Sequence, residues 1–137
     1  MAGESKGSLV ITEQEAAGWL QDYGRAWETA DAELIVSLFT RDASYRETPF
    51  DAAMIGHDAI KRYWIDQPSN HQDVRFSFEI LAVVGNQCFS HWNTKFSKGG
   101  RKLELDGAFR LIFERQPDGP LLCRTLEEWW HQREAAG

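Results

Sequence analysis

The chain has 137 residues, which is about the size of one domain and enough to bury an independent core. Hydrophobic residues make up 42% of it and charged residues 26%, so the composition is that of a globular protein rather than a disordered one. The net charge of −6 argues against an extended nucleic-acid surface, although a local basic patch is compatible with it.

Signals for membranes, export and metals are absent from the sequence. No run of 18 apolar residues occurs, and residues 1–8 lack the apolar stretch of a signal peptide. Cys88 and Cys123 form no CxxC pair, and the histidines show neither HxxxH nor HExxH spacing. We therefore predict a cytoplasmic protein with two buried free thiols and no metal, no cofactor, no nucleic-acid partner and no membrane partner.

Helical patterns dominate the first half of the chain. Thr12 and Glu15 have the spacing of a capping box, and apolar residues at three- and four-residue steps behind them predict a helix to about Ala30. Asp31 is placed to cap a second, short helix. A third helix is predicted to open at residues 56–58.

Strand patterns dominate the second half. A short strand is predicted over residues 43–48, followed by a turn and a partner strand over 52–55. After residue 72 the apolar period changes from 3.6 to 2. Turn signals at Gly85-Asn86, at Gly99-Gly100 and over residues 117–120 then divide the remainder into four strands. The last of these strands is predicted over residues 121–131.

The order of these elements predicts an α+β fold in which helices cover one face of a curved antiparallel sheet. Residues 1–11 are expected to be a disordered lead-in, and residues 12–132 a single domain. Some strand segments, such as residues 81–84 and Trp129-Trp130, are apolar on both alternations. A second apolar sheet face needs a cover, so we predict a homodimer.

Three short motifs occur in a fixed order along the chain. They are Leu38–Ala43 before the first strand, Gly56–Ile60 with Tyr63-Trp64 on the third helix, and Leu105–Gly107 on a late strand. Their order resembles the nuclear transport factor 2-like superfamily, in its SnoaL-like and ketosteroid isomerase-like branch, from Thr12 to His131. The resemblance implies a cone-shaped barrel of three N-terminal helices packed in a curved antiparallel sheet, around a cavity for a small apolar molecule.

Similarity to ketosteroid isomerases implies specific catalytic roles. In those enzymes a tyrosine on the first helix and a protonated aspartate on a late strand form an oxyanion hole, and a carboxylate on the first strand is the base. The matching residues here are Tyr23, Asp106 and Glu47. The pattern departs from that family because the base is a glutamate and because Thr48 separates it from the following proline.

Each catalytic candidate also has a purely structural interpretation. Tyr23 could be a core tyrosine whose hydroxyl bonds a nearby carboxylate. Asp106 lies on the opposite alternation from its leucine neighbours, so it reaches the cavity only if Gly107 forms a bulge. Glu47 could instead form an ion pair with an arginine, for which the candidates are Arg46, Arg110 and Arg124.

Five further residues are candidates for binding a ligand: Tyr45, Trp64, His91, Trp92 and Trp129. Tyr45 shares the strand face of Glu47, so both should line the cavity if either does. Tyr45 and Tyr23 together are similar to the two tyrosines of scytalone dehydratases, although Gly24 stands where those enzymes have an aspartate. His91 and the three tryptophans could equally be structural residues. Glu127 and Glu128 are neighbours on a strand and point to opposite faces, so one of them must face the interior or an interface.

The function expected from these residues is cofactor-independent proton transfer on an apolar carbonyl compound, of the isomerase, cyclase or lyase type. The competing expectations are a ligand-binding or dimeric accessory domain without catalysis, and a protein-interaction domain that uses the exposed sheet.

Overall fold

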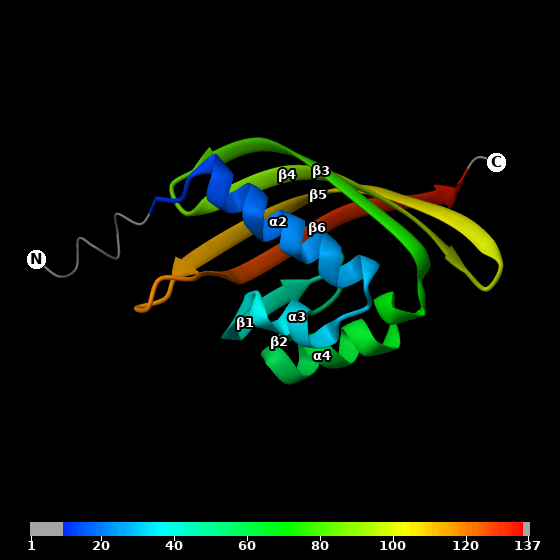
Figure 1. Cartoon of the computed structure of the whole chain (residues 1–137), viewed down its shortest axis with the longest axis horizontal. Coiled ribbons are helices and arrows are strands. Elements are labelled where there is room, and N and C mark those ends of the chain that lie inside the picture. The colour runs from blue at the N-terminus through cyan, green and yellow to red at the C-terminus, as the bar shows by residue number, and fades with distance from the viewer. Residues whose placement is uncertain (1–9, 136–137) are drawn as a thin grey trace, which may run out of the picture.

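The computed structural model describes residues 10–135, and it places three helices and a 3-10 turn before the long strands (Figure 1). The helical elements are α2 (Glu13–Glu28), α3 (Ala32–Ser37), α4 (His57–Asp66) and the turn η1 (Pro68–Asn70). The strands are β1 (Phe39–Arg46), β2 (Met54–Ile55), β3 (Gln72–Val84), β4 (Gln87–Lys98), β5 (Arg101–Arg115) and β6 (Leu121–Glu134).

The helices begin where local chemistry supplies caps. The capping box before α2 is confirmed, because Thr12 and Glu15 each accept the other's backbone N–H at 3.0 Å. The Asp31 carboxylate accepts the backbone N–H of Leu34 at 3.0 Å and so caps α3. Helix α4 follows Gly56, whose φ of +90° is accessible to glycine without strain.

All six strands form one sheet in the order β2-β1-β6-β5-β4-β3. Strands β3 to β6 are joined as successive antiparallel hairpins, as expected. The pairing of β1 with β6 is parallel, so the expectation of a wholly antiparallel sheet is wrong at this pair. The chain reaches β6 only after crossing the whole sheet, which allows the two strands to run in the same direction.

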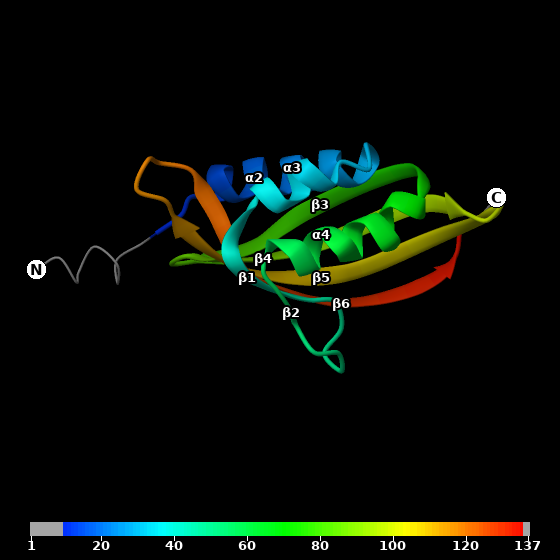
Figure 2. The ribbon, with the colours of Figure 1, turned by 90° about the horizontal axis from the view of Figure 1, so that it is seen from below.

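The α+β fold class is confirmed. The helices lie along one side of a strongly curved, unclosed sheet, as Figure 2 shows from below. Helix α2 runs diagonally across the sheet and contacts β3, where Gly24 permits a close approach: a Cβ there would stand 2.6 Å from the Phe76 ring. No helix within residues 10–135 is long and apolar enough to cross a membrane.

Element boundaries differ from the prediction in a few places. Most of the expected lead-in, residues 1–9, lies outside the described residues, but Ile11 is 2% exposed and donates its backbone N–H to Gly85. Ile11 therefore packs with the folded part of the chain. Strand β6 continues to Glu134 because it stays paired with β5 beyond position 131. The regular alternation of β3 stops near Leu81, where an irregularity in the pairing with β4 leaves this leucine 60% exposed.

Candidate functional site

The concave face of the sheet and the helices enclose a cavity of about 420 Å³. This volume lies in the range of sites for small organic ligands. Its wall is mainly aromatic, and the aromatic lining residues are Tyr23, Trp27, Tyr45, Tyr63, Trp64, Trp92, Phe96 and Trp130. Its polar lining consists of Glu47, Glu128, Gln67, His71, Lys98, Arg101 and Gln132.

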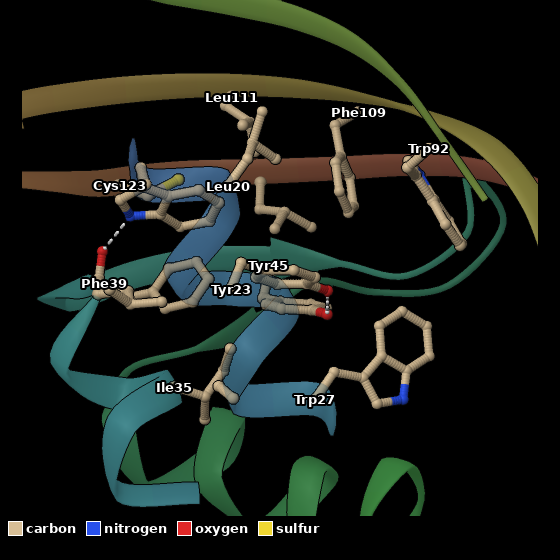
Figure 3. Packing of buried hydrophobic residues seen from close by; sticks show 14 of the residues in the cluster. Leu20, Tyr23, Trp27, Ile35, Phe39, Tyr45, Trp92, Phe109, Leu111 and Cys123 are labelled. Atoms are coloured by element: carbon tan, nitrogen blue, oxygen red, sulfur yellow. Dashed lines mark hydrogen bonds between the residues drawn. The ribbon is translucent and has the colours of Figure 1, made fainter. Parts of the chain in front are cut away.

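Two tyrosines meet in the buried core beside this cavity. The hydroxyls of Tyr23 on α2 and Tyr45 on β1 are hydrogen-bonded at 2.9 Å, and each residue is 1% exposed (Figure 3). Burial raises the pKa of both phenols well above the ordinary value, and the charge of Glu128 adds to this effect. Both hydroxyls are therefore protonated at neutral pH, and one of the two protons forms the hydrogen bond between them.

Two carboxyl groups stand next to this tyrosine pair. The parallel register of β1 and β6 aligns Tyr45 with Leu126 and Arg46 with Glu127. One residue further along each segment, Glu47 therefore comes to lie beside Glu128. Glu128 is 5% exposed, and burial followed by the charge of Glu47 raises its pKa well above the ordinary value. The nearby hydroxyl of Tyr45 opposes this shift and lowers the pKa of Glu128. Burial and the neighbouring charge of Glu47 therefore favour the neutral form of Glu128.

Neighbouring groups hold the carboxyl pair without neutralising it. The indole of Trp130 donates to the backbone carbonyl of Glu47 at 3.0 Å. Burial raises the pKa of Tyr63 on α4, as do the nearby charges of Glu128 and Glu47. In the part of the chain that the structure describes, no Lys, Arg or His nitrogen lies within 4.0 Å of either carboxylate.

The ion pair considered for Glu47 is therefore wrong. The Arg110 guanidinium binds Glu127 at 2.8 Å on the outer sheet face instead. The Arg46 guanidinium binds the backbone carbonyl of Asp51 at 2.7 Å. The last candidate, Arg124, is exposed.

His71 contributes a third polar feature of the cavity wall. Its Nδ1 accepts the indole N–H of Trp27 at 3.1 Å, and its ring stacks on Phe96 with centroids 3.9 Å apart. Burial, and secondly the charge of Lys98, lowers the pKa of His71 to about 4. The imidazole is therefore neutral at physiological pH.

The structure brings five of the eight predicted site residues to the cavity: Tyr23, Tyr45, Glu47, Trp64 and Trp92. Tyr45 lies on β1 and Glu47 directly follows this strand, and both line the cavity. The roles assigned to them, catalytic or ligand-binding, stay predictions.

The other three predicted residues lie on the outer face of the sheet, so the expectation that they line the cavity is wrong. The side chain of Asp106 is 54% exposed and lies 2.9 Å from His91 Nε2, and Trp129 is 46% exposed. No bulge forms at Gly107: the register runs unbroken through Asn93, Asp106 and His131 across three strands. Asp106 therefore keeps the outward direction that strand alternation demands.

Several cavity residues have no assigned role in the sequence analysis, namely Trp27, Tyr63, His71, Glu128 and Trp130. For Glu128 a usable signal exists, because it alternates with the apolar Leu126 and Trp130 on one strand face. For His71 there is none, since it follows η1 and precedes β3, outside any periodic pattern.

The assembled groups suit acid–base chemistry. An aromatic cavity in which a carboxyl group with a raised pKa lies beside a second carboxyl group offers a proton donor and a proton acceptor side by side. Within residues 10–135 no group of three or more His, Cys, Asp or Glu side chains is arranged to hold a metal ion.

Comparisons with known proteins place this architecture. Residues 20–119 match the model of the SnoaL-like domain family. Comparison with curated protein sequences finds no significant match. Among solved structures, a conserved protein from Planctomyces limnophilus superposes with a TM-score of 0.77 at 17% identity, over 88% of this chain and 97% of the other.

Two further solved structures share this fold. A ketosteroid isomerase-like protein from Erwinia carotovora atroseptica has a TM-score of 0.66 at 14% identity, over 93% of this chain and 100% of the other. The epoxide hydrolase/cyclase-like enzyme SalBIII, involved in pyran ring formation in the polyether salinomycin, has a TM-score of 0.73 at 14% identity, over 90% and 98%. The family match and the shared architecture lead to one conclusion: the chain belongs to the SnoaL-like domain family of the nuclear transport factor 2-like superfamily.

Proposed function

We propose that this protein binds a small, largely apolar carbonyl compound in its cavity and catalyses cofactor-independent proton transfer, of the isomerase, cyclase or lyase type. The observation that carries the proposal is the pair Glu47 and Glu128, which lacks a cationic partner among residues 10–135 and lies in an aromatic cavity. Charged groups without partners are costly to bury, so such a pair is better explained by chemistry than by stability.

The two carboxyl groups take different roles in this proposal. Glu47, the less buried of the two, is the base that removes a proton from the carbon next to the substrate carbonyl. Glu128 is held neutral by burial and donates a hydrogen bond to the oxygen that becomes negatively charged. The Tyr23 and Tyr45 pair supplies a further donor, because one of its two hydroxyl protons is not used between them. Glu47 then returns the proton to the substrate.

Proton exchange tests this proposal without knowledge of the natural substrate. The probes are 2-tetralone and androst-4-ene-3,17-dione in D₂O, with deuterium incorporation next to the carbonyl followed by NMR. The wild type should accelerate exchange, and Glu47→Gln should reduce the acceleration by roughly 10²–10⁴-fold while ligand affinity changes little.

Asp106→Asn is the matched control, because it also converts an acidic residue to its amide but lies on the outer sheet face. It should leave exchange at the wild-type rate. Equal exchange rates in wild type and Glu47→Gln, with a probe that the wild type does turn over, would remove Glu47 as the base.

A non-catalytic ligand-binding or accessory domain is the second candidate function. It is favoured by the Tyr23–Tyr45 hydrogen bond, in which each phenol already has a partner without any ligand. This alternative predicts saturable binding of the same ketones, measured by calorimetry, with no acceleration of exchange by the wild type.

We further infer that the protein is a homodimer and that it works in a reducing compartment such as the cytoplasm. Support for the dimer comes from apolar side chains on the outer sheet face, including Val84 at 61% and Trp129 at 46% exposure. Support for the compartment comes from Cys88 and Cys123, which are buried and free.

A further inference from the structure

His71 is fixed in orientation by two aromatic neighbours from different elements. Trp27 near the end of α2 donates its indole N–H to His71 Nδ1 at 3.1 Å. Phe96 of β4 stacks against the imidazole at a centroid distance of 3.9 Å and an interplanar angle of 17°. The ring therefore has little freedom to rotate, although it sits outside any long helix or strand.

These contacts also fix the position of the imidazole proton. An indole nitrogen can only donate, so Nδ1 must accept and carries no proton. The single proton of a neutral imidazole then lies on Nε2. Protonation of the ring would place two N–H groups against each other, and burial together with Lys98 acts in the same direction. In residues 10–135 no protein acceptor is found for Nε2.

The His71 end of the cavity is distinct from the carboxyl end. Glu47 and Glu128 both act on the pKa of Tyr63, whereas the charge that acts on His71 is that of Lys98. In Figure 3 the indole nitrogen of Trp27, which points to His71, lies on the edge of the ring away from the tyrosine hydroxyls. Most of the larger side chains that line the cavity are aromatic.

We propose that the Nε2–H of His71 binds an acceptor oxygen of the ligand at the end of the cavity opposite the carboxyl pair. This inference rests on the proposed function and deepens it: the substrate carries two oxygen functions, a reacting carbonyl near Glu47 and a second acceptor near His71. The positive charge of Lys98 favours an oxygen acceptor at this end and disfavours an ammonium group.

Two steroids that differ only in a distal carbonyl test this assignment. Androst-4-ene-3,17-dione has an oxygen at each end, and androst-4-en-3-one lacks the second one. Calorimetry should show that the wild type binds the dione about threefold to tenfold more tightly, as one hydrogen bond predicts. His71→Phe keeps the stacking on Phe96 but removes the donor, so it should abolish the preference. His71→Gln restores an amide donor near the position of Nε2 and should regain most of it.

Side-chain ¹⁵N NMR of the ligand-free protein supplies an independent readout. His71 should carry its proton on Nε2 and should not titrate between pH 5 and 8. A proton on Nδ1, a charged ring at pH 6.5, or a dione preference unchanged in His71→Phe would overturn the inference while leaving the proposed function standing. If Glu47→Gln exchanges deuterium at the wild-type rate while the dione preference still depends on His71, the role of Glu47 as the base is overturned and the assignment of His71 stands. Absence of binding of both steroids to the wild type would overturn the two together.

Discussion

The hydroxyl oxygens of Tyr23 and Tyr45 lie 2.9 Å apart, although α2 and β1 bring them from positions 22 residues apart in the chain. Both side chains are fully buried, and the Tyr23 ring also packs edge-on against Trp64 and Phe109. The hydrogen bond is therefore fixed by its surroundings and joins α2 to β1, the strand that Glu47 directly follows.

Double-mutant measurements should show that the two phenols act together. Tyr23→Phe and Tyr45→Phe should each lower the free energy of unfolding by about 1–2 kcal/mol, because each leaves a buried hydroxyl without its partner. The double variant should lose less than the sum of the two, by about 1 kcal/mol, since no hydroxyl then remains unpaired. Strictly additive losses in urea denaturation would contradict this coupling.

The elements were predictable because their signals are local. The capping box of Thr12 and Glu15 and the apolar spacing behind it specify α2 without reference to the rest of the chain. The turn glycines at residues 85 and 99–100 have positive φ and divide the sheet where expected. The parallel pairing of β1 with β6 is different, because it depends on how distant strands assemble.

The candidate site was predictable only in part, for two physical reasons. For Asp106, strand alternation with Leu105 already predicted an outward direction, and the family resemblance pointed the other way. The structure agrees with the prediction from strand alternation, because the Asp106 side chain lies on the outer sheet face. For His71 and Glu128, the decisive facts are long-range contacts, with Trp27 and with Glu47. The contact of His71 leaves no spacing pattern in the sequence, and strand alternation indicates the inward direction of Glu128 but not its contact with Glu47.

Two glycine substitutions should have opposite effects on stability. A Cβ at Gly107 would lie 2.3 Å from the backbone oxygen of Trp129 and 2.9 Å from the Cα of Trp130. Gly107→Ala must therefore displace β6 and should cost about 1–3 kcal/mol. Gly18→Ala, in the middle of α2 with nothing within 4 Å of its Cβ, should gain about 0.5–1 kcal/mol.

Thermal melts of the two alanine variants check this expectation. Gly107→Ala should also weaken ketone binding, because Trp130 holds the backbone carbonyl of Glu47. A Gly107→Ala protein with wild-type melting temperature would mean that β5 and β6 are less closely packed than described.

Assembly is tested by sedimentation equilibrium. A homodimer should give about 31 kDa, twice the 15.7 kDa of one chain. Trp129→Glu places a charge on the outer sheet face and should shift the protein toward the monomer. Ile65→Glu is the matched control, because Ile65 is similarly exposed, at 51%, but lies on α4 away from that face. A wild-type mass of one chain at micromolar concentration would rule out a stable dimer.

The pH dependence of stability reports the ionisation of Glu128 directly. Its pKa in the folded protein is raised above the ordinary 4.5, mainly by burial. Between 4.5 and that raised value the folded protein holds a proton that the unfolded chain has released, so stability falls as the pH rises. Glu128→Gln removes this group and should be increasingly more stable than the wild type above pH 4.5. The difference should grow by at most about 1.4 kcal/mol per pH unit.

Urea denaturation of both proteins at intervals from pH 4 to pH 8 measures this difference, and the titrating groups that do not interact with Glu128 cancel when one free energy is subtracted from the other. Asp106→Asn supplies a control of opposite sign. Hydrogen bonding to Asn93, and to a smaller extent to His91, lowers the pKa of Asp106, so the wild type holds this small advantage above pH 3.8 and loses it as the pH falls. A difference between Glu128→Gln and wild type that does not change with pH would show that Glu128 is ionised in the folded protein. Glu128 could then not be the neutral donor beside Glu47.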